Sequence, residues 1–456
     1  MNGALWTLVL GNAAVVLWLW IHGGGVPLAL QSPGGLLTSL GRVTALVGTY
    51  MILIQVILVA RTPWLERAVG FDRLTVWHRR NGTVAVALVV IHVPLTFVGR
   101  ALLLHTPLGR QISALYDSRP GMITATIGTA VLIWVVLSSL MVVRRTLRYE
   151  TWYLVHLSVY AGVLLAYFHQ VLTGNEFARH PVQRDYWYAL YVFVLLVLLG
   201  FRVVAPAVSF WRHRLHVVEV RRESPRVVSV YMQGQHLERL GGRGGQFFLW
   251  RFFTRSRWWQ AHPFSLSAAP DGRSLRITVK DVGDFTKLIA ELRPGTRVLA
   301  EGPFGTFGPV ESGRGAALIA GGIGITPLRA MLDELIAREL PVTLVHRVLH
   351  EDELVLRHEL DEYERSGRLL VIPVVGDRSQ PGGKNLLSGE HLLRLIPDLP
   401  EREIFLCGPP AMMEHVRAGL AALGIPGHQV HSERFALAAE SAGAIGGRRW
   451  GRTRRI

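Results

Sequence analysis

The hydrophobic pattern divides the chain into an apolar first half and a second half of short strands and helices. Six apolar stretches before residue 205 reach the length that a helix needs to cross a bilayer, about 20 residues. We therefore expect six membrane-spanning helices. They run approximately over residues 5–21, 36–59, 74–102, 122–143, 151–172 and 186–204.

The pattern after residue 204 predicts two further domains. Alternating apolar residues up to about residue 309 indicate short antiparallel strands, and hence a small β-barrel. Later apolar strands alternate with helical stretches, which is the pattern of a parallel α/β sheet. The expected fold is multi-domain. It comprises a six-helix transmembrane bundle (1–205), an antiparallel β-barrel (210–310), a parallel α/β domain (314–437) and a basic, disordered tail (438–456).

Charge indicates how the spans are oriented. Arginines gather between spans two and three and after span four, whereas residues 21–38 contain none. By the positive-inside rule these basic loops are cytoplasmic, which predicts a multi-pass protein of the cell membrane with both termini inside. We attribute the net charge of +16 to the orientation of the spans and to contact of the arginines with anionic lipid of the bilayer. We exclude a nucleic-acid partner, since no basic cluster is interleaved with stacking aromatic residues.

Four histidines lie in two of the expected spans at nearly equal spacing. His78 and His92 are 14 residues apart, and His156 and His169 are 13 apart. Each separation is roughly 20 Å along a helix, which suits two haems stacked across a bilayer ~30 Å thick. Neutral imidazole is a common axial ligand of haem iron. With the expected orientation, His78 pairs with His156 near the cytoplasm and His92 with His169 near the outside.

The spacing of 13 predicts an irregularity in span five. Fourteen residues return a side chain to about the same helix face, and thirteen do not. A bend or a π-bulge is therefore expected between His156 and His169. The alternative is that these are ordinary helix histidines bonded to their neighbours. Two matched pairs argue against it, because ionisable groups in spans are costly and usually functional.

Arg42 is a further charge in the expected membrane region. Span two starts outside, so Arg42 lies in the outer leaflet at about the level of the outer haem. A haem propionate or a reduced anionic species would suit it. Snorkelling to the outer headgroups is the equal alternative.

Three short motifs in the second half suit nucleotide cofactors. The segment 262–265 offers a ring and a hydroxyl to a flavin, and 283–286 precedes a helix whose N-terminus can hold a pyrophosphate. The segment 321–327 follows a strand and opens a helix, and its glycines allow phosphates to approach closely. Glycine turns are common for structural reasons, so the order of the motifs carries the prediction. Their members are His262, Pro263, Phe264 and Ser265; Gly283, Asp284, Phe285 and Thr286; and Gly321, Gly322, Gly324, Thr326 and Pro327.

On these residues the chain resembles the ferric reductase and NADPH oxidase superfamily over about 36–437. That family joins a six-span haem domain to a ferredoxin–NADP reductase-like module. The resemblance implies that the four histidines bind two b-type haems, that Phe264 lies beside the flavin ring and Ser265 near its reactive nitrogen, and that 283–286 binds the FAD pyrophosphate. It also implies a nicotinamide site at 321–327 and at Cys407, Gly408 and Pro409.

Three further residues are candidates in the cofactor half. By the resemblance, Cys407 lies near the nicotinamide and Phe435 covers the flavin, although some twenty residues follow Phe435 here. As the one cysteine, Cys407 excludes an intramolecular disulfide and a four-cysteine iron–sulfur cluster. Arg347 follows the second strand of the nucleotide domain. It can pair with a 2′-phosphate, which would favour NADPH over NADH, or it can be a solvated arginine.

The resemblance implies an NAD(P)H oxidoreductase with FAD and two haems b as cofactors and NADPH or NADH as donor. The candidate catalytic residues are Arg42, Ser265, Cys407 and Phe435. We expect oxygen as the acceptor, giving superoxide. Ferric chelates and an extracytoplasmic redox protein partner are the alternatives. In animal oxidases a second histidine follows the outer ligand of span three by one turn, and Thr96 stands at that position here.

Overall fold

The structure is a computed structural model that describes residues 2–433 apart from 145, 148, 175–179, 256, 311–313 and 378–385. The chain separates into two compact units, Met1–Val204 and Ala205–Ile456. Phe435 and the tail at 438–456 lie outside the described residues.

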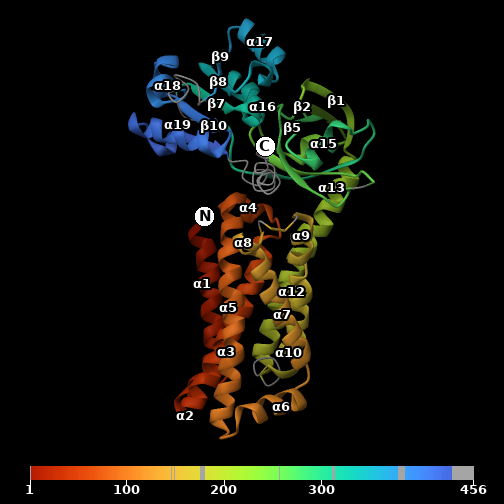
Figure 1. The fold of residues 1–456 in the computed structure, drawn as a ribbon, viewed down its shortest axis with the longest axis vertical. Coiled ribbons are helices and arrows are strands. Elements are labelled where there is room, and N and C mark those ends of the chain that lie inside the picture. The colour runs from red at the N-terminus through yellow and green to blue at the C-terminus, as the bar shows by residue number, and fades with distance from the viewer. Residues whose placement is uncertain are drawn as a thin grey trace, which may run out of the picture. The chain divides into compact units, whose positions relative to one another are not determined.

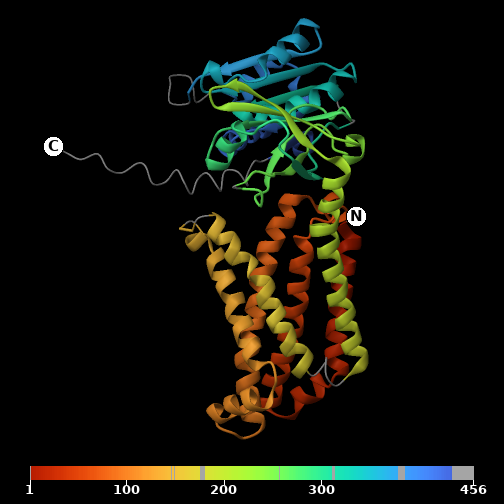
Figure 2. The same ribbon diagram turned by 90° about the vertical axis from the view of Figure 1, so that its right-hand side faces the viewer.

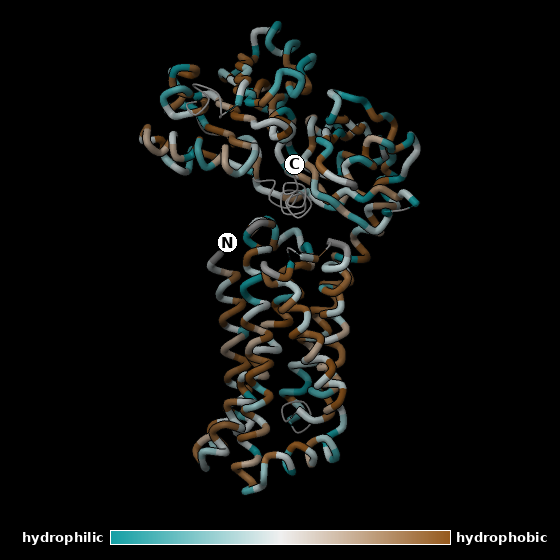
Figure 3. Tube along the Cα trace, in the orientation of Figure 1, coloured by the Kyte–Doolittle hydropathy of each residue, from teal (hydrophilic) through white to brown (hydrophobic). Residues whose placement is uncertain are grey.

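The first unit is built from α-helices (Figures 1 and 2). Six helical stretches in the described part of the chain are long and apolar enough to cross a membrane, which confirms the six expected spans. Figure 3 shows apolar residues along the length of these helices. The helices are α1 (Asn2–His22), α2 (Gly25–Gln31), α3 (Pro33–Leu58), α4 (Pro63–Val69), α5 (Phe71–Leu103), α6 (Leu108–Ser118), α7 (Met122–Ser139), α8 (Met141–Arg144), α9 (Tyr149–Leu157), α10 (Val159–Thr173) and α12 (Pro181–Leu199), and a π-helical turn, Gly200–Val204, follows α12.

The fifth span is interrupted between its two histidines. Helix α9 ends at Leu157 and α10 begins at Val159, with Ser158 as a turn between them. The N–H of Ser158 is shared between the carbonyls of Leu154 and Val155, at 3.3 and 3.1 Å, so the last turn tightens. The irregularity that the 13-residue spacing predicts is therefore confirmed as a break in the helix.

Helices α3 and α5 pack at very short range through glycines that recur every seven residues. A Cβ on Gly34 would lie 2.4 Å from the Leu103 nitrogen, and one on Gly41 would lie 2.7 Å from the Thr96 hydroxyl oxygen. A Cβ on Gly48 would lie 3.1 Å from Val89. Small residues let membrane helices approach until backbone and side chain touch. The backbone carbonyls of α3 are thereby brought within reach of side chains on α5.

Two short helices lie at one end of the bundle, α2 before α3 and α6 after α5 (Figure 1). The hydrophobic pattern predicts no helix between the third and fourth spans, whereas Leu108–Ser118 is helical. Leu115 of this helix is buried and the hydroxyl of Tyr116 bonds to Thr126 at 2.5 Å. At eleven residues α6 is too short to be a span, which is why the length criterion did not find it.

The second unit begins with α13 (Ala205–His213) and a small antiparallel barrel. Two three-stranded sheets form it, in the orders β1-β2-β5 and β4-β3-β6. Single bridges from His216 to Arg297 and from Leu266 to Ile277 join the sheets, and Phe248, Trp250 and Ile277 fill the interior. The elements are β1 (His216–Ser224), β2 (Val227–Gln233), α14 (Leu237–Leu240), β3 (Phe247–Phe252), β4 (His262–Ser265), β5 (Ser274–Lys280), α15 (Asp284–Ala290) and β6 (Val298–Phe304).

A five-stranded parallel sheet completes the unit, in the order β11-β10-β7-β8-β9. Every residue of β7 is buried, as expected of a strand covered on both faces. The strand order reverses between β7 and β10, and ligands bind at such a switch point, outside the carboxyl ends of the strands. The elements are β7 (Ala316–Gly321), α16 (Ile325–Ile336), β8 (Val342–Val348), α17 (Arg357–Arg365), β9 (Leu370–Val375), α18 (Gly389–Leu395), β10 (Glu403–Cys407), α19 (Pro410–Ala422) and β11 (Val430–Glu433).

Candidate functional site

His78 on α5 and His156 on α9 lie opposite each other. Their ring centroids are 6.0 Å apart and the ring planes are inclined at 60°. Two imidazoles on opposite sides of one metal atom need about this distance, because each metal–nitrogen bond is about 2 Å and each ring centre lies roughly 1 Å beyond its nitrogen. The pair that the orientation predicts for the inner haem is therefore close enough to share one iron.

The two histidines of α5 are held by backbone carbonyls of α3. His78 Nδ1 lies 3.3 Å from the Gln55 carbonyl oxygen, and His92 Nδ1 lies 2.8 Å from that of Gly41. A carbonyl only accepts, so both Nδ1 atoms donate and both Nε2 atoms are free of a proton. The same tautomer is needed to bind a metal through Nε2.

The two histidines of the fifth span are held by hydroxyls. His156 Nδ1 lies 3.3 Å from Ser139 Oγ, and His169 Nδ1 lies 3.0 Å from Thr173 Oγ1. Both hydroxyls donate to carbonyls, Ser139 to Val135 at 2.7 Å and Thr173 to His169 at 2.8 Å. Because each hydroxyl has one hydrogen, both histidines must donate from Nδ1.

All four Nδ1 atoms are thus occupied as donors, and all four Nε2 atoms are left to bind a metal. The pairing of His92 with His169 stays a prediction. Among the described residues, no group of three or more His, Cys, Asp or Glu side chains could hold a metal ion. Two pairs of histidines, each with Nε2 left free, are the donor set that two haems with histidine ligands would need.

Arg42 and Thr96 have partners within the protein. Arg42 Nη2 donates to the Gly23 carbonyl, at the end of α1, at 2.9 Å. The Thr96 hydroxyl lies 3.2 Å from His92 Nδ1. Thr96 is therefore aimed at a candidate ligand.

The two flavin motifs of the sequence lie together in the structure. The ring of His262 on β4 stacks on Phe285 with centroids 3.6 Å apart, and Phe264 is nearly parallel to Phe285 at 6.4 Å. Burial, reinforced by Arg257, lowers the pKa of His262 to about 4, so the ring is neutral at pH 7. Within the described residues, Ser265 Oγ is buried and has no hydrogen-bond partner. A buried hydroxyl of this kind fits a flavin that supplies the missing partner.

Thr286 caps its own turn. Its hydroxyl oxygen accepts from the N–H groups of Val282 and Gly283, both at 2.9 Å, and donates to the Gly283 carbonyl at 2.8 Å. The first N–H groups of a helix have no partner inside it. A pyrophosphate at this segment would therefore be held by the main chain at the start of α15, with Thr286 shaping the turn.

The nucleotide motifs meet at the switch point of the parallel sheet. A Cβ on Gly324 would lie 2.3 Å from the Cys407 carbonyl oxygen, and one on Gly408 would lie 3.0 Å from the Gly321 Cα. Gly322 has φ +52°, in the left-handed region that favours glycine. Gly324 and Gly408 leave no room for a side chain, so the two loops touch through their backbones. Pro409 precedes α19, while Thr326 and Pro327 lie in the first turn of α16.

Cys407 and Arg347 lie at the carboxyl ends of the strands. Cys407 is fully buried, and burial, reinforced by Glu433, raises the pKa of its thiol. The Arg347 guanidinium donates to the carbonyls of Val348 and Gly376, at the ends of β8 and β9. Arg347 is therefore at the edge where a nucleotide is expected, and the main chain holds it there.

Sequence reasoning missed three residues beside this site. His346 is buried, and its Nε2 lies 3.1 Å from the Gly322 carbonyl. Lys280 of the barrel pairs with Glu353 of the nucleotide domain at 2.6 Å. Lys280, Gly322 and Glu353 line a pocket between the two domains. Two signals for them were available in the sequence: His346 directly precedes Arg347, and Lys280 lies just before the 283–286 motif.

Three protein families match parts of the chain. The ferric reductase like transmembrane component matches residues 44–167, the FAD-binding domain matches 215–307 and the oxidoreductase NAD-binding domain matches 318–418.

Individual proteins also resemble the chain. A flavohemoprotein of Pseudomonas aeruginosa is 29% identical over 303 residues, which cover 62% of this chain and 75% of that protein. The electron transfer component of xylene/toluene monooxygenase of Pseudomonas putida is 28% identical, over 39% of this chain and 53% of the relative. Among solved structures, the FAD/NAD-binding domain of a Vibrio cholerae nitric oxide dioxygenase is 26% identical, with a TM-score of 0.42 over 49% of this chain and 99% of that one.

Proposed function

We propose that this protein moves electrons across a membrane. The chain matches the ferric reductase and NADPH oxidase superfamily through its membrane domain and through both cofactor domains. The matched domains make it a multi-pass membrane NAD(P)H oxidoreductase with an FAD/NAD reductase module. The finer proposal is a path from cytoplasmic NAD(P)H through FAD and two b-type haems to an extracytoplasmic acceptor, in the cell membrane and with both termini inside.

The observation that carries the haem proposal is the arrangement of the four histidines. Each donates from Nδ1 to a carbonyl or hydroxyl, which fixes the tautomer and the ring orientation. His78 and His156 would hold the inner haem, and His92 and His169 the outer one. When bound, haem iron takes up and releases one electron at a time, which matches a flavin that receives two electrons as hydride.

Separate groups of residues would bind the flavin and the nicotinamide nucleotide. Phe264 and Phe285 form an apolar wall for the flavin ring, and Ser265 offers its unpaired hydroxyl. The main chain at 283–286 would hold the FAD pyrophosphate. The turn at 321–327, with Cys407, Gly408 and Pro409, would position the nicotinamide nucleotide at the switch point. Arg347 is the candidate contact to a 2′-phosphate and thus to NADPH.

Oxygen is the acceptor that we propose, with superoxide as the product. Histidines on both faces of each iron would leave the haem edge as the place of reaction. A small neutral acceptor reaches such an edge without a docking site. Arg42, in the outer leaflet of the expected span, would attract the anionic product.

Ferric-chelate reduction is the second candidate. Thr96 stands where animal oxidases carry a second histidine, and its hydroxyl is directed at His92. Arg110 lies in α6 and Arg119 directly follows it. In the expected orientation α6 is at the outer end of the bundle, where these two charges would attract an anionic ferric chelate.

One experiment separates the candidates. Detergent-purified protein loaded with haem and FAD is given NADPH or NADH in air, with cytochrome c and with or without superoxide dismutase. Superoxide in proportion to the nucleotide oxidised would support the oxidase. Haem that is reduced, ignores oxygen and reoxidises with a ferric chelate would support the metalloreductase. Haem that stays oxidised with both nucleotides would contradict the electron path itself.

A further inference from the structure

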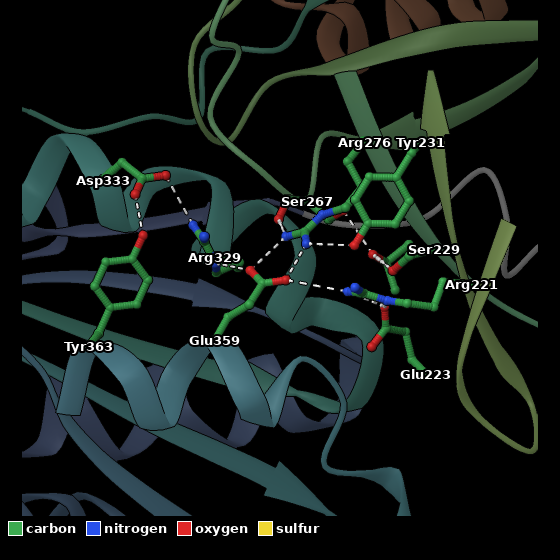
Figure 4. A network of polar contacts seen from close by, with 11 residues as sticks. Arg221, Glu223, Ser229, Tyr231, Ser267, Arg276, Arg329, Asp333, Glu359 and Tyr363 are labelled. Atoms are coloured by element: carbon green, nitrogen blue, oxygen red, sulfur yellow. Dashed lines mark hydrogen bonds and ion pairs between the residues drawn. The ribbon is translucent and has the colours of Figure 1, made fainter. Parts of the chain in front are cut away.

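A buried ionic network joins the barrel to the nucleotide domain (Figure 4). Its centre is Glu359 on α17, which accepts from Arg276 on β5 of the barrel and from Arg329 on α16. Glu359 Oε2 is 3.0 Å from Arg276 Nη2 and 2.8 Å from Arg329 Nε, and Glu359 Oε1 also accepts from Arg276 Nη1. Both arginines are at most 8% exposed. One carboxylate, 21% exposed and also 3.8 Å from the more exposed Arg221, therefore ties the barrel to the nucleotide domain through two buried arginines.

On the barrel side, Arg276 holds the segment that carries the flavin motif. Its Nε donates to Ser267 Oγ at 3.1 Å and its Nη2 donates to the Ser267 carbonyl. Ser267 is two residues after Ser265, the buried hydroxyl without a partner among the described residues. A shift of Arg276 would therefore be transmitted to the backbone beside the flavin site.

On the nucleotide side, Arg329 extends the same network along α16. Its Nη1 pairs with Asp333 at 3.0 Å, and the Tyr363 hydroxyl donates to Asp333. Arg329 is two residues after Pro327, in the helix that the glycine turn opens. Burial alone would raise the pKa of Glu359, but Arg276 and then Arg329 outweigh it and lower that pKa. The carboxylate is therefore ionised at pH 7.

We infer that Glu359 is a positioning residue, which holds the flavin segment and the nucleotide helix at the separation that hydride transfer requires. The step concerned moves a hydride, one proton and two electrons, from nicotinamide C4 to FAD: the C4–H bond breaks, NAD(P)H becomes NAD(P)⁺, and the flavin gains the proton and both electrons. An ion pair of this kind adds little stability over apolar residues of the same size, so the role that we infer for it is to fix the geometry of the two segments. A misplacement of about 1 Å can slow a reaction by about 100-fold.

The test is anaerobic stopped-flow reduction of the flavin in full-length, FAD-loaded protein. Glu359→Gln keeps the size of the side chain and removes its charge, and Glu359→Asp keeps the charge but shortens the reach. We expect both to slow flavin reduction, by roughly 10- to 100-fold for the glutamine variant. With NAD(P)H deuterated at C4, the kinetic isotope effect should rise, because it reports donor–acceptor separation. Glu362→Gln, at an exposed position on the same helix, should leave both unchanged.

The outcomes are distinguishable. Reduction at the wild-type rate with the wild-type isotope effect in either Glu359 variant would overturn the inference. A smaller fraction of reduced flavin with an unchanged isotope effect would also overturn the inference, because a loss of folded protein produces that result. If Glu359→Gln fails to fold, Glu359→Asp decides alone. The inference rests on the proposed function, and that function fails separately if neither NADPH nor NADH reduces the wild-type flavin.

Discussion

His92 Nδ1 donates to the carbonyl oxygen of Gly41 across 2.8 Å, so a candidate outer haem ligand is held by the backbone of a neighbouring helix. His78 Nδ1 has the same relationship to the Gln55 carbonyl oxygen. Gln55 is 14 positions from Gly41, and His78 is 14 positions from His92. The antiparallel helices α3 and α5 thus repeat one contact at both levels. The separation of these two helices therefore sets the orientation of both rings.

Gly41→Ala should disturb the outer site selectively. The new Cβ would lie 2.7 Å from the Thr96 hydroxyl oxygen and 3.2 Å from the Thr96 nitrogen, so either Thr96 or the packing of α3 on α5 must shift and disturb the contacts of His92. We expect the haem content of purified protein to fall from about two toward one per chain, because loss of an outer-shell partner weakens metal binding by roughly 10- to 100-fold. Gly11→Ala, at a position with open space around it, is the control. Full haem content in Gly41→Ala would contradict the proposed ligand role of His92.

Ser139→Ala tests the inner site. Ser139 Oγ accepts from His156 Nδ1 and from Trp152 Nε1, both at 3.3 Å. Removal of this acceptor leaves the imidazole less basic, so the midpoint potential of the inner haem should rise and its affinity should fall roughly 10- to 100-fold. Redox titration of the two haems measures both effects. Ser138→Ala, whose hydroxyl donates to Val135, is the matched control. Equal potentials in the two variants would exclude Ser139 from the haem site.

Local pattern was enough to predict the spans, the antiparallel barrel, the parallel sheet and the irregularity in span five. The last of these depends on 13 residues failing to close a helical repeat, and the break at Ser158 confirms it. What the pattern cannot contain is contact between distant segments. Arg276 and Glu359 are 83 residues apart and meet only because the barrel and the nucleotide domain pack together. Thr286 is a different case: its capping bonds to Val282 and Gly283 are local, and they were missed because 283–286 was interpreted as a pyrophosphate site.

The haem, flavin and nucleotide roles of individual residues stay predictions. Phe264 and Phe285 are placed as the flavin proposal needs, and the glycines at 321–327 touch the Cys407 loop. These placements follow from the fold. A role follows only from a bound cofactor, and Phe435 lies outside the described residues.

Cys407 should resist thiol reagents in the folded protein. It is fully buried, and burial raises its pKa, so little thiolate forms at neutral pH. It is the single cysteine of the chain, which makes labelling unambiguous. We expect negligible labelling of native protein by a maleimide over the time that denatured protein takes to label completely. Rapid labelling of native protein would show that the carboxyl end of β10 opens, and faster labelling without nucleotide than with it would place that opening at the nicotinamide site.

Buried His346 should make the second unit sensitive to acid. Burial lowers the pKa of His346 from 6.5 to about 4, against the opposing effect of its bond to Gly322. The folded protein favours the neutral ring, so this stabilisation is complete above pH 6.5 and is lost as the pH falls toward 4. Between pH 6.5 and 5 one such histidine accounts for about 2 kcal/mol. His346→Gln should therefore lose less thermal stability than wild type over that pH range. The measurement is thermal unfolding at each pH, monitored by the rise in fluorescence when FAD is released. His350→Gln, at an exposed position, should follow the wild-type profile. Identical profiles for all three proteins would mean that folding does not lower the pKa of His346.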